Sequence, residues 1–279
     1  MINLSERLIC PHCGASMCVT DNGKSVICNG ERKKHCFDFS SSGYLNFSTP
    51  SQSGSGDSKE AVRSRTAFLE SDSYLGISEA VTESVLKYCD GGLVVDAGCG
   101  EGYYTNNLAK EYCGDVIGFD LSKFGVEHAS KAAKRQGINN SFFAVGSVFE
   151  IPLADGVADA VINIFAPCVE KEYSRLLKRG GVLITVGAGE EHLLGLKKAI
   201  YDMTYKNSER DDMPKELMFL EEKRVSYMLK LENNGLITSL FSMTPYYYRT
   251  GESGFKRLAA LDKLETEIDV VIKIFRKEV

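Results

Sequence analysis

The chain has 279 residues, of which 43% are hydrophobic and 25% are charged, and its formal net charge is -5. This composition excludes collagen-like, low-complexity and disordered chains, and it allows a sizeable buried core. The negative net charge excludes a generic polycation, so any nucleic-acid binding has to come from a local cluster of cations. We expect a soluble, cytoplasmic protein that does not enter a membrane, because the sequence shows neither a signal-peptide pattern nor an apolar run of about 20 residues.

The first 47 residues differ in kind from the rest of the chain. They contain five of the nine cysteines, namely Cys10, Cys13, Cys18, Cys28 and Cys36. An odd cysteine count argues against a complete disulfide framework, and in a reducing compartment metal binding or burial is the expected use of thiols. We therefore predict a small zinc-binding domain over residues 1–47.

Cys10 and Cys13 form a knuckle in which two thiolates on one tight turn can reach the same tetrahedral metal ion. Cys28 supplies a third ligand, and the fourth is either His35 or Cys36, between which the spacing does not decide. The alternative is a set of buried, metal-free cysteines. Zinc is favoured because so short a segment builds little core, whereas a bound zinc ion supplies about 10–16 kcal/mol of folding free energy.

The remaining elements can be predicted in chain order. Residues 48–71 are expected to form a linker, rich in Ser and Gly up to residue 58, and a connecting helix. Apolar spacing predicts helices over 59–71 and 77–89. Strands at 93–97, 115–119, 141–145, 158–164 and 182–187 then alternate with helices at 103–112, 123–136 and 169–177. This alternation predicts an α/β domain over residues 72–279 with a mostly parallel sheet. Alternating apolar residues over 267–276 predict a final strand, for which an antiparallel direction is one option.

A glycine-rich loop follows the first of these strands. Gly98, Gly100 and Gly102 lie between the strand and the next helix, and glycines there allow a ligand to approach the backbone closely. Asp120 ends the second strand, 22 residues beyond Gly98, where an acidic residue typically binds ribose hydroxyls. The combination is a much stronger signal for a nucleotide site than a glycine loop alone.

The loop does not fit a dinucleotide, because Tyr103 stands where that fingerprint requires glycine. Asp96 brings a negative charge into the loop, which suits a cationic amino-acid ligand better than a pyrophosphate. These features favour S-adenosylmethionine as the ligand. We expect Glu101 in the same site, and we expect the adenine near Ser147 and Val148, which follow the third parallel strand. The alternative role of Asp96 is to cap the amides of its own loop.

Residues 96–105 resemble the first motif of class I methyltransferases, and the chain as a whole resembles the 23S ribosomal RNA guanine-N1 methyltransferases. Further segments match that family, and they are residues 10–13, 35–38, 43–46, 65–69, 74, 165–168, 192–193, 196–197 and 243–245. The resemblance implies a Rossmann-like domain that methylates N1 of a guanine in 23S rRNA, and it implies a homodimer. It also implies that His35 is the fourth zinc ligand and that Tyr74 and His192 lie near S-adenosylmethionine.

RNA binding requires cations that are gathered locally. The candidates are Arg32, Lys33 and Lys34 beside the zinc site and Arg63 and Arg65 after the linker, although a solvated charged face is the plainer interpretation of such a run. The chain departs from the family in three additional residues before His35 and in a linker without Lys or Arg. Two other functions share the same features, a small-molecule methyltransferase and a non-catalytic binding protein that retains the fold.

The base that accepts the proton of guanine N1 is not identified by the sequence. A guanine paired in a duplex hides N1, so the target base has to lie in a loop or be flipped out. Attack by N1 also requires the loss of its proton, which a nearby base would assist. Glu101 and Asp159 are conceivable bases, but the sequence identifies neither one.

Overall fold

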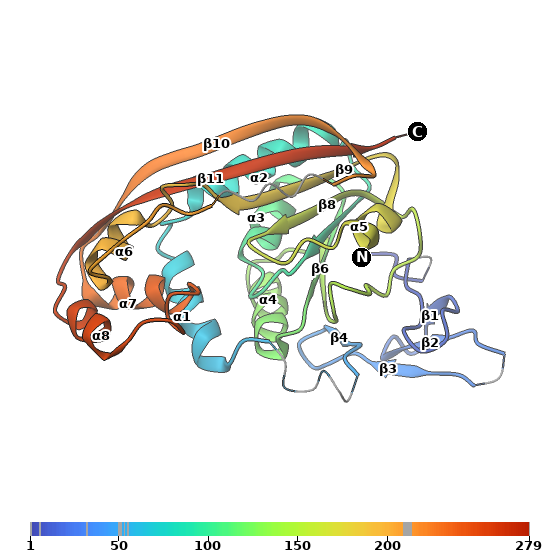
Figure 1. The fold of residues 1–279 in the computed structure, drawn as a ribbon. Coiled ribbons are helices and arrows are strands. Elements are labelled where there is room, and N and C mark those ends of the chain that lie inside the picture. The colour runs from blue at the N-terminus through green and yellow to red at the C-terminus, as the bar shows by residue number, and fades with distance from the viewer. Residues whose placement is uncertain are drawn as a thin grey trace.

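The computed structural model describes residues 2–5, 7–31, 33–49, 52, 54, 56–208 and 214–278, so Arg32 lies outside the described residues. Two sheets organise them (Figure 1). The smaller is antiparallel and consists of β1 (Met17–Val19), β2 (Ser25–Cys28) and β3 (Cys36–Asp38). The larger has eight strands in the order β10-β11-β9-β8-β5-β6-β7-β4.

The larger sheet is mostly parallel, as the sequence predicts. Its strands are β4 (Leu45–Asn46), β5 (Leu93–Ala97), β6 (Asp115–Asp120), β7 (Ser141–Val145), β8 (Ala158–Ile164), β9 (Leu177–Ala188), β10 (Leu217–Leu231) and β11 (Leu264–Lys277). All neighbouring pairs from β4 to β9 are parallel. Strand β11 is antiparallel to both of its neighbours, β9 and β10, so β10 runs in the same direction as the parallel strands. The central strands are continuous apolar runs because both of their faces are covered.

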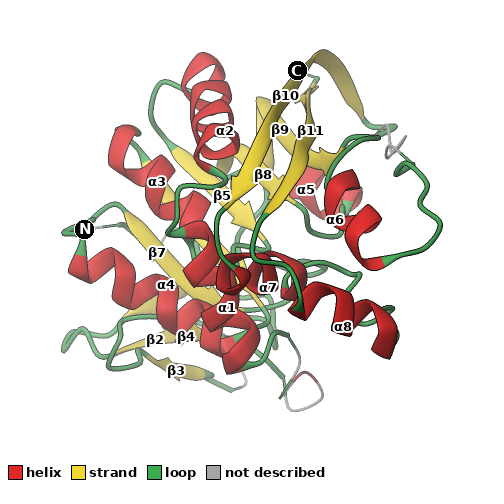
Figure 2. Cartoon of the chain, turned by 90° about the vertical axis from the view of Figure 1, so that its left-hand side faces the viewer, coloured by secondary structure: helices red, strands yellow, loops and turns green. Residues whose placement is uncertain are grey.

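Eight helices are described, in the order α1 (Lys59–Leu69), α2 (Leu75–Tyr88), α3 (Tyr103–Glu111), α4 (Lys123–Arg135), α5 (Glu170–Leu176), α6 (Leu194–Ile200), α7 (Asn234–Ser242) and α8 (Glu252–Ala259). The hydroxyl of Ser58 accepts from Ala61 N at 3.2 Å and starts α1, while Ser122 caps α4 in the same way. Helices α1, α6, α7 and α8 gather at the end of the sheet toward which β8 points (Figures 1 and 2). That end carries the glycine loop.

The N-terminal unit, which we define as residues 1–47 so far as they are described, packs on one face of the large sheet. Its buried Leu8 belongs to the same apolar cluster as Val95 and Phe119 of the sheet, whereas the opposite face of the sheet packs against α2 and α3. Ile9 N donates to Pro152 O at 3.1 Å, and Arg7 forms an ion pair with Asp115 at 2.6 Å. The last strand of the unit, β4, extends the sheet beside β7. The unit therefore takes the place of a covering helix and shares a core with the rest of the chain.

Several elements differ from the prediction. Strand β10 and helices α6 to α8 are additional, β9 begins at Leu177 rather than at residue 182, and α2 begins at Leu75 rather than at residue 77. Strand β10 is an edge strand whose side chains alternate between exposed and half-buried and include Glu222, Lys223 and Arg224, so it lacks the apolar run that reveals a buried strand. Among the described residues, no helix combines the length and apolar character that crossing a bilayer requires.

Candidate functional site

The glycine loop closes tightly between β5 and α3. Gly98 and Gly102 have φ values of 92° and 79°, in the left-handed region that favours glycine. A Cβ atom on Gly98 would lie 2.7 Å from the Cβ of Ala166, and one on Gly102 would lie 2.6 Å from the Cβ of Ala129. Larger residues are therefore excluded at both positions by geometry and by space.

Asp120 joins this loop to the end of β6. One carboxylate oxygen accepts from Gly100 N at 3.0 Å, and the other accepts from Ser122 N at 2.7 Å. Burial raises the pKa of Asp120, and these two amides counteract the rise. Each oxygen of this half-buried carboxylate retains a lone pair, so Asp120 can also accept from the hydroxyls of a ribose.

Asp96 lies fully inside, at the end of β5. Its Oδ2 atom accepts from the hydroxyl of Thr105 at 2.5 Å, while its Oδ1 atom is buried without a hydrogen-bond partner among the described residues. Burial raises the pKa of Asp96 to about 7. The hydrogen-bond donor to Asp96 is a helix hydroxyl and not a loop amide, so the structure does not show the capping alternative. An orphaned buried carboxylate oxygen of this kind fits a ligand that brings its own donor, such as an ammonium group.

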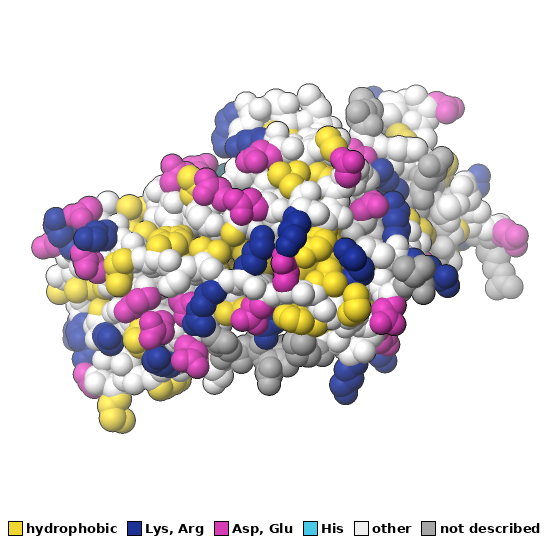
Figure 3. All heavy atoms as spheres, turned by 90° about the horizontal axis from the view of Figure 1, so that it is seen from above, with side chains coloured by type: hydrophobic (Ala, Val, Ile, Leu, Met, Phe, Trp, Pro, Cys, Tyr) yellow, Lys and Arg dark blue, Asp and Glu magenta, His cyan; other side chains and the backbone are white. Residues whose placement is uncertain are grey.

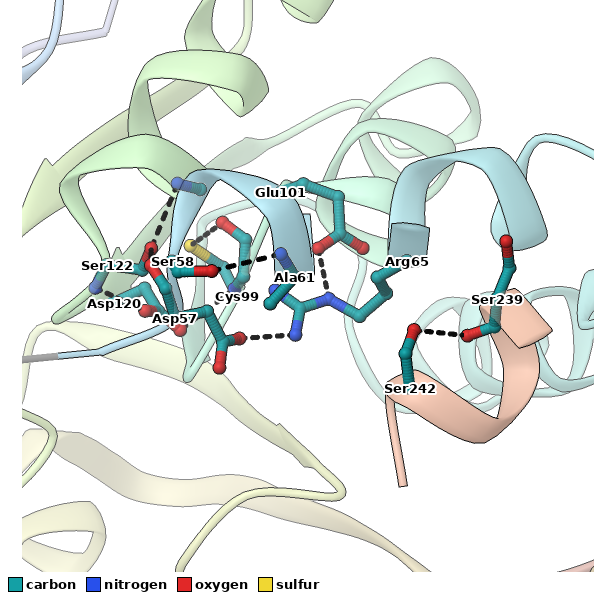
Figure 4. A network of polar contacts seen from close by, with 12 residues as sticks. Asp57, Ser58, Ala61, Arg65, Cys99, Glu101, Asp120, Ser122, Ser239 and Ser242 are labelled. Carbon is teal, nitrogen blue, oxygen red and sulfur yellow. Dashed lines mark hydrogen bonds and ion pairs between the residues drawn. The ribbon is translucent and has the colours of Figure 1, made fainter. Parts of the chain in front are cut away.

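Arg65 connects α1 to the loop (Figure 4). Its guanidinium forms ion pairs with the carboxylates of Glu101 and Asp57, and Asp57 O accepts from the hydroxyl of Ser122 at 2.9 Å. Burial raises the pKa of Glu101, and the charge of Arg65 opposes that rise. The sequence places Arg65 among the RNA-contacting cations. The structure places it against the loop with two carboxylate partners, so we assign it to the support of the loop.

Tyr74, Phe165 and His192 form an aromatic group beside the loop. Asp269 N donates to Nδ1 of His192 at 3.2 Å, so the ring proton resides on Nε2, which faces the Tyr74 hydroxyl at 3.4 Å. Burial lowers the pKa of His192 to about 4, which keeps the ring neutral. Phe165 stacks on His192 with ring centroids 5.8 Å apart and 21° between the planes. The sequence matches a family at residues 165–168, but that match assigned Phe165 no role.

The other expected residues lie either near this site or at the opposite end of the strands. Ser147 and Val148 directly follow β7, and Gly146 N donates to Asp120 O at 3.0 Å, so the expected adenine-binding residues lie next to the acidic strand end. Asp159 lies near the start of β8, where it accepts from Leu93 N at 2.8 Å and pairs with a lysine. It is therefore at the wrong end of the strand to act as a base.

A second group of side chains meets in the N-terminal unit. The ligand atoms of Cys10, Cys13, Cys28 and His35 all lie within 4.8 Å of one another. The Sγ atoms of Cys13 and Cys28 are 3.7 Å apart, close to the roughly 3.8 Å expected between two thiolates on a tetrahedral zinc ion. Cys36 is exposed and points toward Asp38, so His35 is the residue that completes this group. The four side chains could hold a metal ion.

Exposed cations lie near that group. Lys33 and Lys34 are exposed next to His35, and Arg63 is exposed on α1. On the face that carries β10 and β11, basic and acidic side chains are interspersed (Figure 3). Pairs such as Lys87 with Glu221, at 2.6 Å, contribute to this mixture.

The raised pKa of Asp96 predicts how stability depends on pH. In the unfolded chain this carboxyl ionises near pH 4, whereas the folded protein retains its proton up to about pH 7. Its stabilising contribution is therefore complete below pH 4 and is lost as the pH rises to about 7, by on the order of 4 kcal/mol. Asp96→Asn, which cannot ionise, should become increasingly more stable than the unaltered protein from pH 4 to pH 7 and hold that advantage above it. Urea denaturation without added ligand measures the difference, and a difference independent of pH would contradict the prediction.

Comparisons with known proteins agree with this geometry. A family model described as a methyltransferase domain matches residues 90–233. A Bacillus subtilis protein named "Putative 23S rRNA (guanine-N(1)-)-methyltransferase YxjB" is 31% identical over 281 residues, which cover 96% of each chain. The 23S rRNA (guanine(748)-N(1))-methyltransferase of Streptomyces fradiae is 29% identical and covers 84% of this chain and 83% of its own.

A solved structure supports the fold separately. The crystal structure of a Bacillus halodurans protein, titled a "putative methyltransferase", superimposes with a TM-score of 0.50 over 72% of this chain and 98% of its own, at 14% sequence identity. At that identity the likeness concerns the fold alone, and it confirms the class I methyltransferase architecture. With a full-length relative above 30% identity and a matching domain model, the chain belongs to the family of 23S rRNA guanine-N1 methyltransferases.

Proposed function

We propose that this protein transfers a methyl group from S-adenosylmethionine to N1 of a guanine in 23S rRNA. The main support is the alignment with the Bacillus subtilis relative over 96% of both chains, which includes both the glycine loop and the cysteine-rich unit. A small-molecule methyltransferase would need the loop but not the unit. The exposed Lys33 and Lys34 beside the metal-ligand group favour a polyanionic substrate.

The residues at the ends of β5, β6 and β7 have separable roles in this proposal. S-adenosylmethionine supplies an electrophilic methyl group on its sulfonium. Asp96 offers its unpartnered oxygen to the ammonium of the methionine, and Asp120 accepts from the ribose hydroxyls. Ser147 and Val148 border the adenine, and the backbone of Gly98, Gly100 and Gly102 allows the ligand to approach closely.

The proposed cofactor site is completed by three further residues, Tyr74, Glu101 and His192. His192 is neutral and directs its Nε2 proton to Tyr74, so this pair supplies a fixed polar wall rather than a proton acceptor. Glu101 is engaged by Arg65. Catalysis therefore depends on positioning the guanine and excluding water, with the N1 proton leaving to a base that these residues do not include.

The function is tested by methyl transfer. Purified protein is incubated with S-adenosylmethionine labelled on its methyl group and with unmodified 23S rRNA, and the RNA is digested to nucleosides. We expect the label in 1-methylguanosine. Label in another nucleoside, or no transfer to RNA by protein that binds S-adenosylmethionine normally, would contradict the proposal.

Asp120→Ala should weaken S-adenosylmethionine binding by roughly 1–3 kcal/mol, because charge-assisted hydrogen bonds to the ribose are lost. Titration calorimetry measures the change. Asp262→Ala removes an exposed carboxylate outside the site and is the matched control. Equal affinities for the two variants would remove Asp120 from the cofactor site.

We also propose that Cys10, Cys13, Cys28 and His35 hold one structural zinc ion. Elemental analysis of protein purified without chelator should give about one zinc per chain, as expected for a closed four-ligand site. His35→Ala should lose the metal and unfold at a clearly lower temperature, whereas Cys36→Ser should retain it. The reverse ranking would transfer the ligand role to Cys36, and metal-free protein would contradict the site.

Phosphate contacts are proposed for Arg32, Lys33, Lys34 and Arg63. Neutralising Arg32, Lys33 and Lys34 together should raise the KM for RNA, leave the affinity for S-adenosylmethionine unchanged and lower the salt slope by about one unit or less for each lost cation.

The control for that variant removes three exposed lysines on or next to β10, α8 and β11, away from the metal-ligand group (Figure 1), namely Lys230, Lys256 and Lys263. Both triple variants change the net charge equally, so a specific role requires that only the first one impairs RNA methylation. Equal effects on RNA methylation would indicate that the net charge of the protein matters and not local contacts with phosphate. The homodimer implied by the resemblance stays a prediction, which sedimentation of the purified protein would test.

A further inference from the structure

Phe165 has a backbone conformation that its residue type disfavours. It directly follows β8, the strand that lies beside β5, and its φ is 52°, in the left-handed region. A phenylalanine there is strained, and such strain persists where the surrounding structure imposes it, most often at functional sites. The side chain is also 42% exposed, although the strand before it is buried. Packing in the core therefore does not explain why a phenylalanine occupies this position.

The turn that carries Phe165 is fixed to the glycine loop by groups other than its ring. The amide of Asn163 donates to Ala97 O and to Pro167 O, both at 3.2 Å, and the Tyr173 hydroxyl donates to Pro167 O at 2.9 Å. Phe165 N donates to Val186 O at 3.0 Å. These bonds connect the end of β5, where the cofactor loop begins, to the turn after β8. The ring is consequently held in a fixed position relative to that loop.

The ring surroundings are aromatic and uncharged. Phe165 stacks on the neutral His192, and its centroid lies 6.4 Å from that of Tyr74. His192 and Tyr74 are both buried, so Phe165 forms the exposed end of this aromatic group. Ala166, the next residue, contacts Gly98 of the cofactor loop so closely that a Cβ atom on Gly98 would lie 2.7 Å from its own Cβ. An exposed aromatic surface thus lies directly beside the loop that binds the cofactor.

We propose that Phe165 is a positioning residue that stacks on the target base and orients its ring edge toward the transferred methyl group. This inference rests on the proposed function, which supplies the base as substrate. A guanine that leaves its RNA stack loses contacts with neighbouring bases, and an aromatic side chain replaces them. Stacking depends little on base identity, so Phe165 holds and orients the base while other contacts select it.

The test compares Phe165→Ala and Phe165→Trp in steady-state methylation of unmodified 23S rRNA. The alanine variant should lose about tenfold in kcat/KM for RNA, within the range measured when base stacking is removed. It should bind S-adenosylmethionine as the unaltered protein does, by calorimetry. The tryptophan variant should recover most of the activity because it restores a stacking surface.

Phe219→Ala is the matched control, because Phe219 has the same 42% exposure but lies on the edge strand β10. It should leave kcat/KM unchanged. Phe165→Gly separates stacking from folding: it removes the ring and relieves the left-handed strain, so it should unfold at a higher temperature than Phe165→Ala while being equally impaired.

Two results would overturn the proposal. If Phe165→Ala methylates RNA within twofold of the unaltered protein, the ring does not position the base, although the proposed function stands. If Phe165→Gly recovers activity in step with its stability, the alanine defect is structural and not a loss of stacking. Failure of the unaltered protein to methylate RNA would overturn the proposed function and this inference together.

Discussion

A buried carboxylate requires hydrogen-bond donors or a cation to compensate for lost hydration, and within the described chain Asp96 has a donor for only one of its two oxygens. One oxygen receives the Thr105 hydroxyl, and the other faces no donor. Burial penalises the charged form, so without a cationic partner the group retains its proton toward neutral pH. An ammonium placed beside it would restore the charge and satisfy the oxygen. The destabilisation caused by burying this carboxylate can therefore be relieved by a cationic ligand, and that relief adds to the binding free energy of the ligand.

The glycine loop between β5 and α3 is held in place by residues that are far away in the sequence. Arg65, on the helix that follows the linker, neutralises Glu101 and contacts Asp57, while Asp120 receives the amide of Gly100. On the other face of the sheet, the N-terminal unit supplies Leu8 and other apolar side chains to a common core. Loss of folding in the cysteine-rich unit would consequently expose the underside of the strands that present the loop. A structural metal there would act on catalysis through packing.

Much of this arrangement could be predicted from the sequence. Strands β5 to β8 are short apolar runs buried on both faces, and Gly98, Gly100 and Asp120 have a spacing that is typical of a nucleotide site. Strand β10 could not be predicted, because an edge strand with one solvated face alternates charged residues. The role of Arg65 could not be predicted either, since a cation after a linker looks the same in sequence whether it meets phosphate or Glu101. Spacing left His35 and Cys36 equal, and only the direction of the two side chains separates them.

The charges at the site limit how a nucleic acid can approach it. Asp57, Asp96, Glu101 and Asp120 gather around the loop, and Arg65 is the cation that pairs with two of them. This environment suits a sulfonium and an ammonium, but it repels phosphate. In the proposed function, the RNA backbone would therefore be held away from these carboxylates by exposed cations such as Lys33, Lys34 and Arg63, and only an uncharged base would enter. An aromatic surface such as that of Phe165 would bind a base without adding charge, so it is compatible with the acidic surroundings of the glycine loop.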